Sequence, residues 1–120
     1  MPYGHSDEEW NETKRELRAV LVAKARDRGV IPYSAVVSQI GPIRFAPDDH
    51  SFHHMLDETS TDEDEHGRGL LTVVVVHRNG DMVPGPGFFD LAARRGREVI
   101  DIDKTWLDEL KTVWRYWRDH

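Results

Sequence analysis

The stretch Gly67–Ala92, GRGLLTVVVVHRNGDMVPGPGFFDLA, decides the fold expected for this chain. The run from Leu70 to Val76 is apolar or β-branched, and such residues favour a packed, extended backbone. Asn79-Gly80 is typical of a tight hairpin turn, because both residues tolerate a positive φ. Two prolines in Pro84–Gly87 prevent a long returning strand, since proline cannot donate to a ladder. We therefore predict a small β-hairpin, followed by a short helix that begins at two phenylalanines.

A long first helix is predicted before this stretch, over about residues 7–28. Ser6 and Glu9 have the spacing of a capping box, and apolar residues follow at helical spacing. Gly29 is a suitable residue to end the helix. The last turn carries bases that complement the helix dipole. These bases are Lys24, Arg26 and Arg28.

Two shorter helices and a long final helix complete the expected architecture. A short helix should begin at Ser34, which suggests a helix-turn-helix element with the first helix, and one of about two turns should begin near Pro47. A further turn could be capped by Ser60 and Glu63. The final helix has an apolar stripe opposite a charged face. The stripe is Trp106, Leu107, Leu110, Val113, Trp114 and Trp117, and the charged face includes Asp108, Lys111, Arg115 and Arg118. This pattern predicts an amphipathic helix whose tryptophans pack in the core rather than stack on nucleic-acid bases.

Length and composition indicate one domain over residues 1–120. The chain has no cysteine, which excludes disulfides and thiolate chemistry and favours a cytoplasmic location. It has neither the pattern of a signal peptide nor an apolar run near the ~20 residues of a membrane span, so we expect a soluble protein. Residues 48–66 hold eight of the 22 acids and no Lys or Arg, which leaves 14 acids against all 16 bases elsewhere. The net charge of −6 is therefore local to this segment.

Within the acidic segment, residues 57–67 are interpreted as an acidic loop with freedom to move. Its four consecutive acids form either a solvated surface or a surface that docks a basic protein partner. These acids are Asp62, Glu63, Asp64 and Glu65.

Four arginines form the best candidate contact for nucleic acid or for an acidic partner. They are Arg78, Arg94, Arg95 and Arg97. A guanidinium fork matches the oxygens of a phosphate group, which makes contact with a phosphate backbone plausible. The alternative is that the last three satisfy the carbonyl end of a short helix.

A histidine cluster is the candidate for metal chemistry. His50, His53 and His54 stand at i, i+3 and i+4, so His50 and His54 would share a helix face, and Asp57 lies one turn further. Zinc or manganese would suit such ligands. However, the sequence lacks the glutamate of an HExxH motif and no other ligand is fixed, so a solvated polar face is the alternative.

Two short motifs resemble known families. Tyr33-Ser34-x-x-Val37 and Val76-His77-Arg78-Asn79-Gly80 resemble parts of the winged-helix half of alkylguanine DNA alkyltransferases, over about residues 30–88. The Pro-Cys-His-Arg motif of that family is missing, so the resemblance implies a winged-helix fold without alkyl transfer. Gly67-Arg68-x-Leu70-Leu71-Thr72 with Pro86-Gly87-Phe88-Phe89 resembles a motif, GRxLL(S/T)xVVV…PGxGFF, of small uncharacterised bacterial proteins. That resemblance implies a family but no activity.

The combined prediction is a single α+β domain with winged-helix-like organisation. It should be mainly helical, with a small β-hairpin and a long C-terminal amphipathic helix. The favoured function is a non-enzymatic module of a nucleic-acid-associated or regulatory complex, with no cofactor, no membrane contact and an open oligomeric state. One alternative is a small metal-dependent hydrolase or nuclease that uses the histidine cluster. The other is a protein-interaction adaptor that docks a basic partner on the acidic segment.

Overall fold

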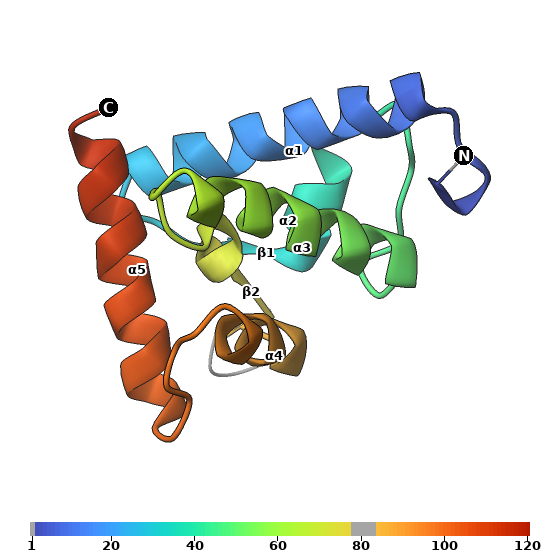
Figure 1. The fold of residues 1–120 in the computed structure, drawn as a ribbon. Coiled ribbons are helices and arrows are strands. Elements are labelled where there is room, and N and C mark those ends of the chain that lie inside the picture. The colour runs from blue at the N-terminus through green and yellow to red at the C-terminus, as the bar shows by residue number, and fades with distance from the viewer. Residues whose placement is uncertain (1, 78–83) are drawn as a thin grey trace.

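Helices surround a short apolar segment in the computed structural model, which describes residues 2–77 and 84–120 (Figure 1). The described elements are, in chain order, η1 (Pro2–Gly4), α1 (Asp7–Arg26), β1 (Ile31–Pro32), α2 (Tyr33–Ser38), α3 (His50–Glu65), η2 (Leu71–Val74), β2 (Val75–Val76), α4 (Pro86–Arg94) and α5 (Ile102–Arg118). The architecture is therefore mainly helical with a very small sheet, as expected.

Helix α1 begins as the sequence predicts but ends differently. The Ser6 hydroxyl accepts a hydrogen bond from the Glu9 amide at 3.1 Å, and the Glu9 carboxylate accepts one from the Ser6 amide at 3.3 Å, which completes the capping box. At the other end, the helix stops at Arg26, and Arg28 instead of Gly29 takes the left-handed conformation, with φ of 54°. The Gly29 amide then donates to the Lys24 carbonyl at 3.0 Å and closes the turn.

The strand predicted for the apolar run needs correction. Most of the apolar run forms the 3₁₀ helix η2, and only Val75–Val76 is a strand. This strand pairs in parallel with β1, so that Ile31 lies opposite Val75. Side chains from Leu70 to Val76 are all buried, because the segment passes through the core instead of along one face of a sheet. The predicted turn and return at residues 79–83 lie outside the described residues.

Helix α3 is longer than the two turns expected, and it includes most of the segment interpreted as an acidic loop. The apolar face of Phe52, Met55 and Leu56 is followed by three polar side chains that are also buried. These are Thr59, Ser60 and Glu63. Ser60, predicted as a cap, lies inside the helix instead. Its hydroxyl accepts a hydrogen bond from the Thr72 amide at 2.9 Å and so ties α3 to η2. Buried hydroxyls therefore extend the core-facing side of the helix beyond its apolar residues.

Helix α4 starts at Pro86, just before the two phenylalanines, and ends at Arg94. In α5, Leu110, Val113 and Trp117 are buried as predicted. Leu107 is 44% exposed, which corrects its place on the buried stripe. The core-facing side of α5 is instead completed by Thr105 and Glu109.

The core lies where η2 is enclosed by α1, α3 and α5. Figure 1 shows α1 and α3 running across the molecule, with α5 along one side so that its C-terminal end lies beside the C-terminal end of α1. Two α5 tryptophans bond to other segments: the Trp106 indole donates to the Val73 carbonyl at 3.1 Å, and the Trp114 indole to the Gly29 carbonyl at 3.2 Å. Within residues 2–77 and 84–120, none of the helices has the length and hydrophobicity needed to cross a membrane.

Candidate functional site

Two of the four candidate arginines bind carboxylates of the protein itself. The Arg97 guanidinium donates to both oxygens of Asp64, at 2.7 and 2.8 Å, and to both oxygens of Glu109, at 2.9 and 3.1 Å. The Arg95 guanidinium also bonds to Asp64, at 3.0 Å. Arg94 is 64% exposed and lies 3.6 Å from Asp57. Arg78 lies outside the described residues.

The Arg97 contacts hold three segments together. Asp64 comes from α3 and Glu109 from α5, and the Glu109 carboxylate also accepts a hydrogen bond from the Leu70 amide at 2.9 Å. The hydrogen bonds that Arg97 donates to Asp64 lower the pKa of this carboxyl group, and the bonds that Arg97 donates to Asp64 and Glu109 raise the pKa of Arg97. A phosphate group could reach Arg97 only in competition with two carboxylates.

The four consecutive acids of α3 also find partners within the protein. Glu63, whose side chain is only 2% exposed, accepts a hydrogen bond from the Arg18 guanidinium at 2.7 Å and pairs with Arg68 through its other oxygen. Asp62 lies 2.7 Å from the Lys14 ammonium, and Glu65 lies 3.9 Å from Arg95. We call the four acids Asp62, Glu63, Asp64 and Glu65, together with the bases that pair with them, the paired acid segment.

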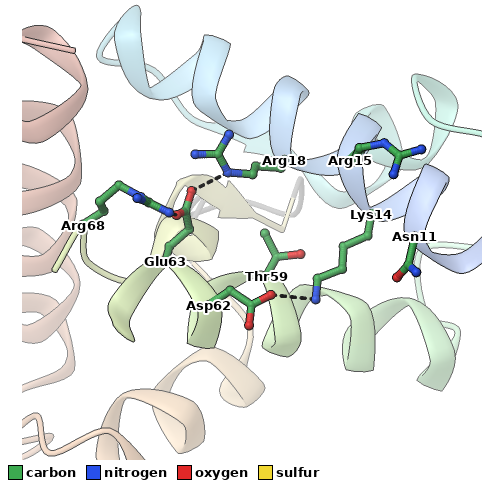
Figure 2. Close-up of a pocket in the computed structure, with 8 residues that line it drawn as sticks. All are labelled: Asn11, Lys14, Arg15, Arg18, Thr59, Asp62, Glu63 and Arg68. Atoms are coloured by element: carbon green, nitrogen blue, oxygen red, sulfur yellow. Dashed lines mark hydrogen bonds and ion pairs between the residues drawn. The ribbon is translucent and has the colours of Figure 1, made fainter. Parts of the chain in front are cut away.

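Part of the paired acid segment lines a groove of about 380 Å³ between α1 and α3 (Figure 2). Figure 2 shows the Arg18–Glu63 pair on one side and the Lys14–Asp62 pair on the other, with Thr59 between them. Because bases from α1 meet acids from α3 across the groove, its polar groups connect two helices. The ion pairs that line the groove therefore serve to hold α1 against α3.

The histidine cluster does not converge on a common point. His50 and His54 each pack edge-on against the Tyr3 ring, with centroids 5.9 and 5.6 Å away. His53 has a different partner from the other two histidines, since its Nε2 lies 2.9 Å from the Pro47 carbonyl oxygen. Burial raises the pKa of Asp57, and Arg94 opposes this rise. Among residues 2–77 and 84–120, the structure groups no three His, Asp or Glu side chains in a way that could hold a metal ion.

The structure instead gathers bases that the sequence shows only as two separate helix faces. The described lysines and arginines that make no ion pair with a described Asp or Glu are Lys24, Arg26, Arg28, Arg44, Lys111 and Arg115. All except Arg44 belong to the C-terminal ends of α1 and α5. We call these two ends the basic corner, which consists of Lys24, Arg26, Arg28, Lys111, Trp114, Arg115 and Arg118.

Aromatic and backbone contacts hold the basic corner together. The Arg28 guanidinium lies over the Trp114 ring, 5.5 Å from its centroid, and the Trp114 indole is fixed to the Gly29 carbonyl. Arg26 lies over the Trp117 ring at 5.3 Å and donates to the backbone oxygen of His120 at 3.0 Å. A cavity of about 220 Å³ opens here. It is lined by Arg28, Lys111, Trp114, Arg115 and Arg118.

The backbone at Arg28 is unusual for a side chain of this size. Its φ of 54° lies in the left-handed region, where glycine is the common residue after a helix and other residues cost about 1–2 kcal/mol. This conformation places the Arg28 guanidinium on Trp114 at the edge of the cavity. Strain of this kind is characteristic of functional positions, which makes Arg28 a candidate contact residue.

The local charge of the corner is opposite to that of the whole chain. Its six bases are accompanied within residues 24–28 and 111–120 by two acids, Asp27 and Asp119, and Asp119 binds the adjacent Arg118 through both oxygens at 3.0 Å. The sequence contains both halves of the corner, as the last turn of one helix and the polar face of another. No local signal shows that the two halves meet, because only the packing of α5 against α1 brings them together.

No family model, curated protein or solved structure matches this chain at a significant level. A function can therefore be argued only from the residues and their geometry.

Proposed function

We propose that the protein is a non-enzymatic module of a nucleic-acid-associated complex, and that the basic corner contacts a phosphate backbone. The observation that carries this proposal is that four bases line one cavity. Three of them, Arg28, Lys111 and Arg115, make no ion pair with an Asp or Glu that the structure describes, and Arg118 pairs with Asp119. Arginine and lysine supply the phosphate contacts of nucleic-acid-binding surfaces, and Trp114 adds an aromatic side chain among them. The proposed function requires no cofactor.

The proposal places phosphate contact at the corner instead of at Arg95 and Arg97. Phosphate at Arg97 would have to displace two bidentate carboxylates, Asp64 and Glu109, whose side chains are only 14% and 7% exposed, and unpairing such groups is costly. Phosphate at Lys111 or Arg115 would displace only water and counterions, and the release of counterions from nucleic acid favours binding. Contact through Arg94 and Arg78 stays a prediction from the sequence.

We also propose that the fold is winged-helix-like. The order of the elements α1, β1, α2, α3 and β2 supports this proposal. It is a helix, a strand, two helices and a strand, which is the order expected of a winged-helix domain. The turn and return predicted for the hairpin, residues 79–83, lie outside the described part of the chain.

Binding of labelled nucleic acid tests the proposal. Fluorescence anisotropy would measure the affinity of a short duplex and of a single strand of the same length at several salt concentrations. We expect Arg115→Glu to weaken binding about tenfold and to lower the slope of log K against log salt by about one or two, as the loss of a phosphate contact and the added repulsion require.

Arg44→Glu is the matched control, because Arg44 is also exposed and without an ion pair among the described residues but lies outside the corner. It should bind as tightly as the unmodified protein. Equal weakening by both variants would show only a general charge effect, and absence of binding to either nucleic acid would refute the proposal.

A further inference from the structure

Exposed apolar side chains gather near the start of α5. Of the residues whose burial the structure describes, the large hydrophobic side chains that are exposed are Tyr3, Ile100, Ile102 and Leu107. Three of these four precede or belong to the first two turns of α5. Isolated exposed apolar residues are ordinary, but several close together indicate a surface that contacts another molecule.

A groove of about 500 Å³ lies between α4 and α5, and of these exposed side chains Ile102 lines it. Its apolar walls are formed by Pro84, Pro86, Phe89, Ile102 and Trp106. The Trp106 ring is held in position by the hydrogen bond from its indole to the Val73 carbonyl. A fixed aromatic ring and two prolines form a preorganised floor, which lowers the cost of ordering a ligand.

Acids that make no ion pair with a base described in the structure line the same groove. Asp90 and Asp103 belong to its lining, and neither makes an ion pair with a lysine or arginine that the structure describes. Glu98 and Asp101, which lie between Asp90 and Asp103 in the sequence, make no ion pair with these described bases either. Lys104, which follows Asp103 directly in the sequence, is bound to Asp108 at 2.6 Å. We call this site the acidic groove.

We propose that the acidic groove docks a segment of a partner protein that presents an apolar side chain flanked by lysine or arginine. The apolar floor would bury the anchor side chain, and Asp90 and Asp103 would pair with the flanking cations. Nucleic acid would be repelled by these carboxylates. Docking the grooves of two copies face to face would bring acids against acids, which disfavours a symmetric dimer through this site.

The acidic groove goes beyond the function proposed above and does not depend on it. Asp103 and Arg115 stand twelve residues apart on one helix, which corresponds to about 18 Å. One molecule could therefore hold a basic protein segment and nucleic acid at the same time. Variants at either site should leave the other site unaffected.

Two synthetic peptides serve as probes: one with leucines at helical spacing among lysines, and its counterpart with glutamate for every lysine. Isothermal titration calorimetry at physiological salt would compare them. We expect the lysine peptide to bind the unmodified protein at least about tenfold more tightly, and the double variant Asp90→Lys/Asp103→Lys to invert this preference. Equal binding of the two peptides, or an unchanged preference in the double variant, would overturn the proposal.

Two controls separate docking from general attraction to an acidic protein. Glu8→Lys/Asp48→Lys makes the same change in net charge at exposed positions outside the groove, and it should keep the preference for lysine. Ile102→Ser should weaken binding several-fold, whereas Ile100→Ser, at a more exposed isoleucine that lines a different cavity, should not. All these side chains are exposed, so circular dichroism should show folded variants. Equal effects of target and control variants would also overturn the proposal.

Discussion

The paired acid segment and the basic corner are both dense in charge, and they differ in whether the protein neutralises that charge itself. In the paired acid segment, Glu63 is buried and Asp64 is partly buried, and each is bound by two arginines. In the basic corner, Lys111 and Arg115 are exposed, and the structure shows no carboxylate partner for them among the residues it describes. Charge density alone therefore does not identify a binding surface. Charge that remains uncompensated after folding is the better indicator.

The two regions should respond to substitution in opposite ways. Removal of one member of a buried pair leaves a charge without compensation in a low dielectric, which costs stability. Removal of an exposed base leaves nothing uncompensated inside the protein, so it changes binding and hardly changes stability. The following predictions test this difference.

Arg97→Ala should cause the largest loss of stability. It leaves Asp64 and Glu109, whose side chains are 14% and 7% exposed, without their shared partner. Breaking buried pairs of this kind costs about 3–5 kcal/mol in the free energy of unfolding. Urea denaturation followed by circular dichroism would measure it. A loss below about 1 kcal/mol would show that the paired acid segment does not support the fold.

Acid should weaken the paired acid segment selectively. Arg97 lowers the pKa of Asp64 in the folded protein, so the unfolded chain takes up this proton at higher pH. The resulting stability is fully present above the ordinary pKa of Asp, about 3.9, and is lost as the pH falls through the lower folded value. The contribution of Asp57 to stability depends on pH in the opposite direction. Burial raises its pKa, so this contribution is lost as the pH rises. Melting temperatures of the unmodified protein and of Arg97→Ala should therefore converge below pH ~4. A difference independent of pH would contradict this account.

Arg28→Gly separates binding from stability in the basic corner. Glycine removes the left-handed strain of about 1–2 kcal/mol, and the loss of the contact with Trp114 offsets about 0.5–1 kcal/mol of this gain. We expect the free energy of unfolding to be unchanged or higher by about 1 kcal/mol. Binding of the duplex should nevertheless weaken. A destabilised variant would show that Arg28 has a structural role, and undiminished binding would remove it from the proposed interface.

Lys111→Ala/Arg115→Ala should have the smallest effect on stability. Both side chains are exposed on α5, and alanine is a good helix former. The free energy of unfolding should stay within about 0.5 kcal/mol of its original value, as is usual for surface positions. Thermal denaturation in parallel with Arg97→Ala gives the direct comparison. A loss similar to that of Arg97→Ala would mean that the corner, too, is part of the structural framework.

The helices were largely predictable from the sequence because they depend on neighbours within one or two turns. The capping box at Ser6 and Glu9 and the spacing of Leu110, Val113 and Trp117 both act locally. Errors arose where the deciding partner is distant. The apolar run became η2 and a short strand because helices enclose it, and Ser60 lies within α3 because its hydroxyl bonds to Thr72.

The sequence by itself determined the mainly helical architecture, the amphipathic last helix and the local concentration of negative charge. Only the tertiary structure decided which charges are used internally. Arg97 and Arg115 are the same residue type in a similarly charged part of the chain, yet one binds Asp64 and Glu109 and the other shows no carboxylate partner in the described structure. The physical reason is that helix formation depends on residues three or four positions apart, whereas ion pairing depends on distance and burial between separate elements.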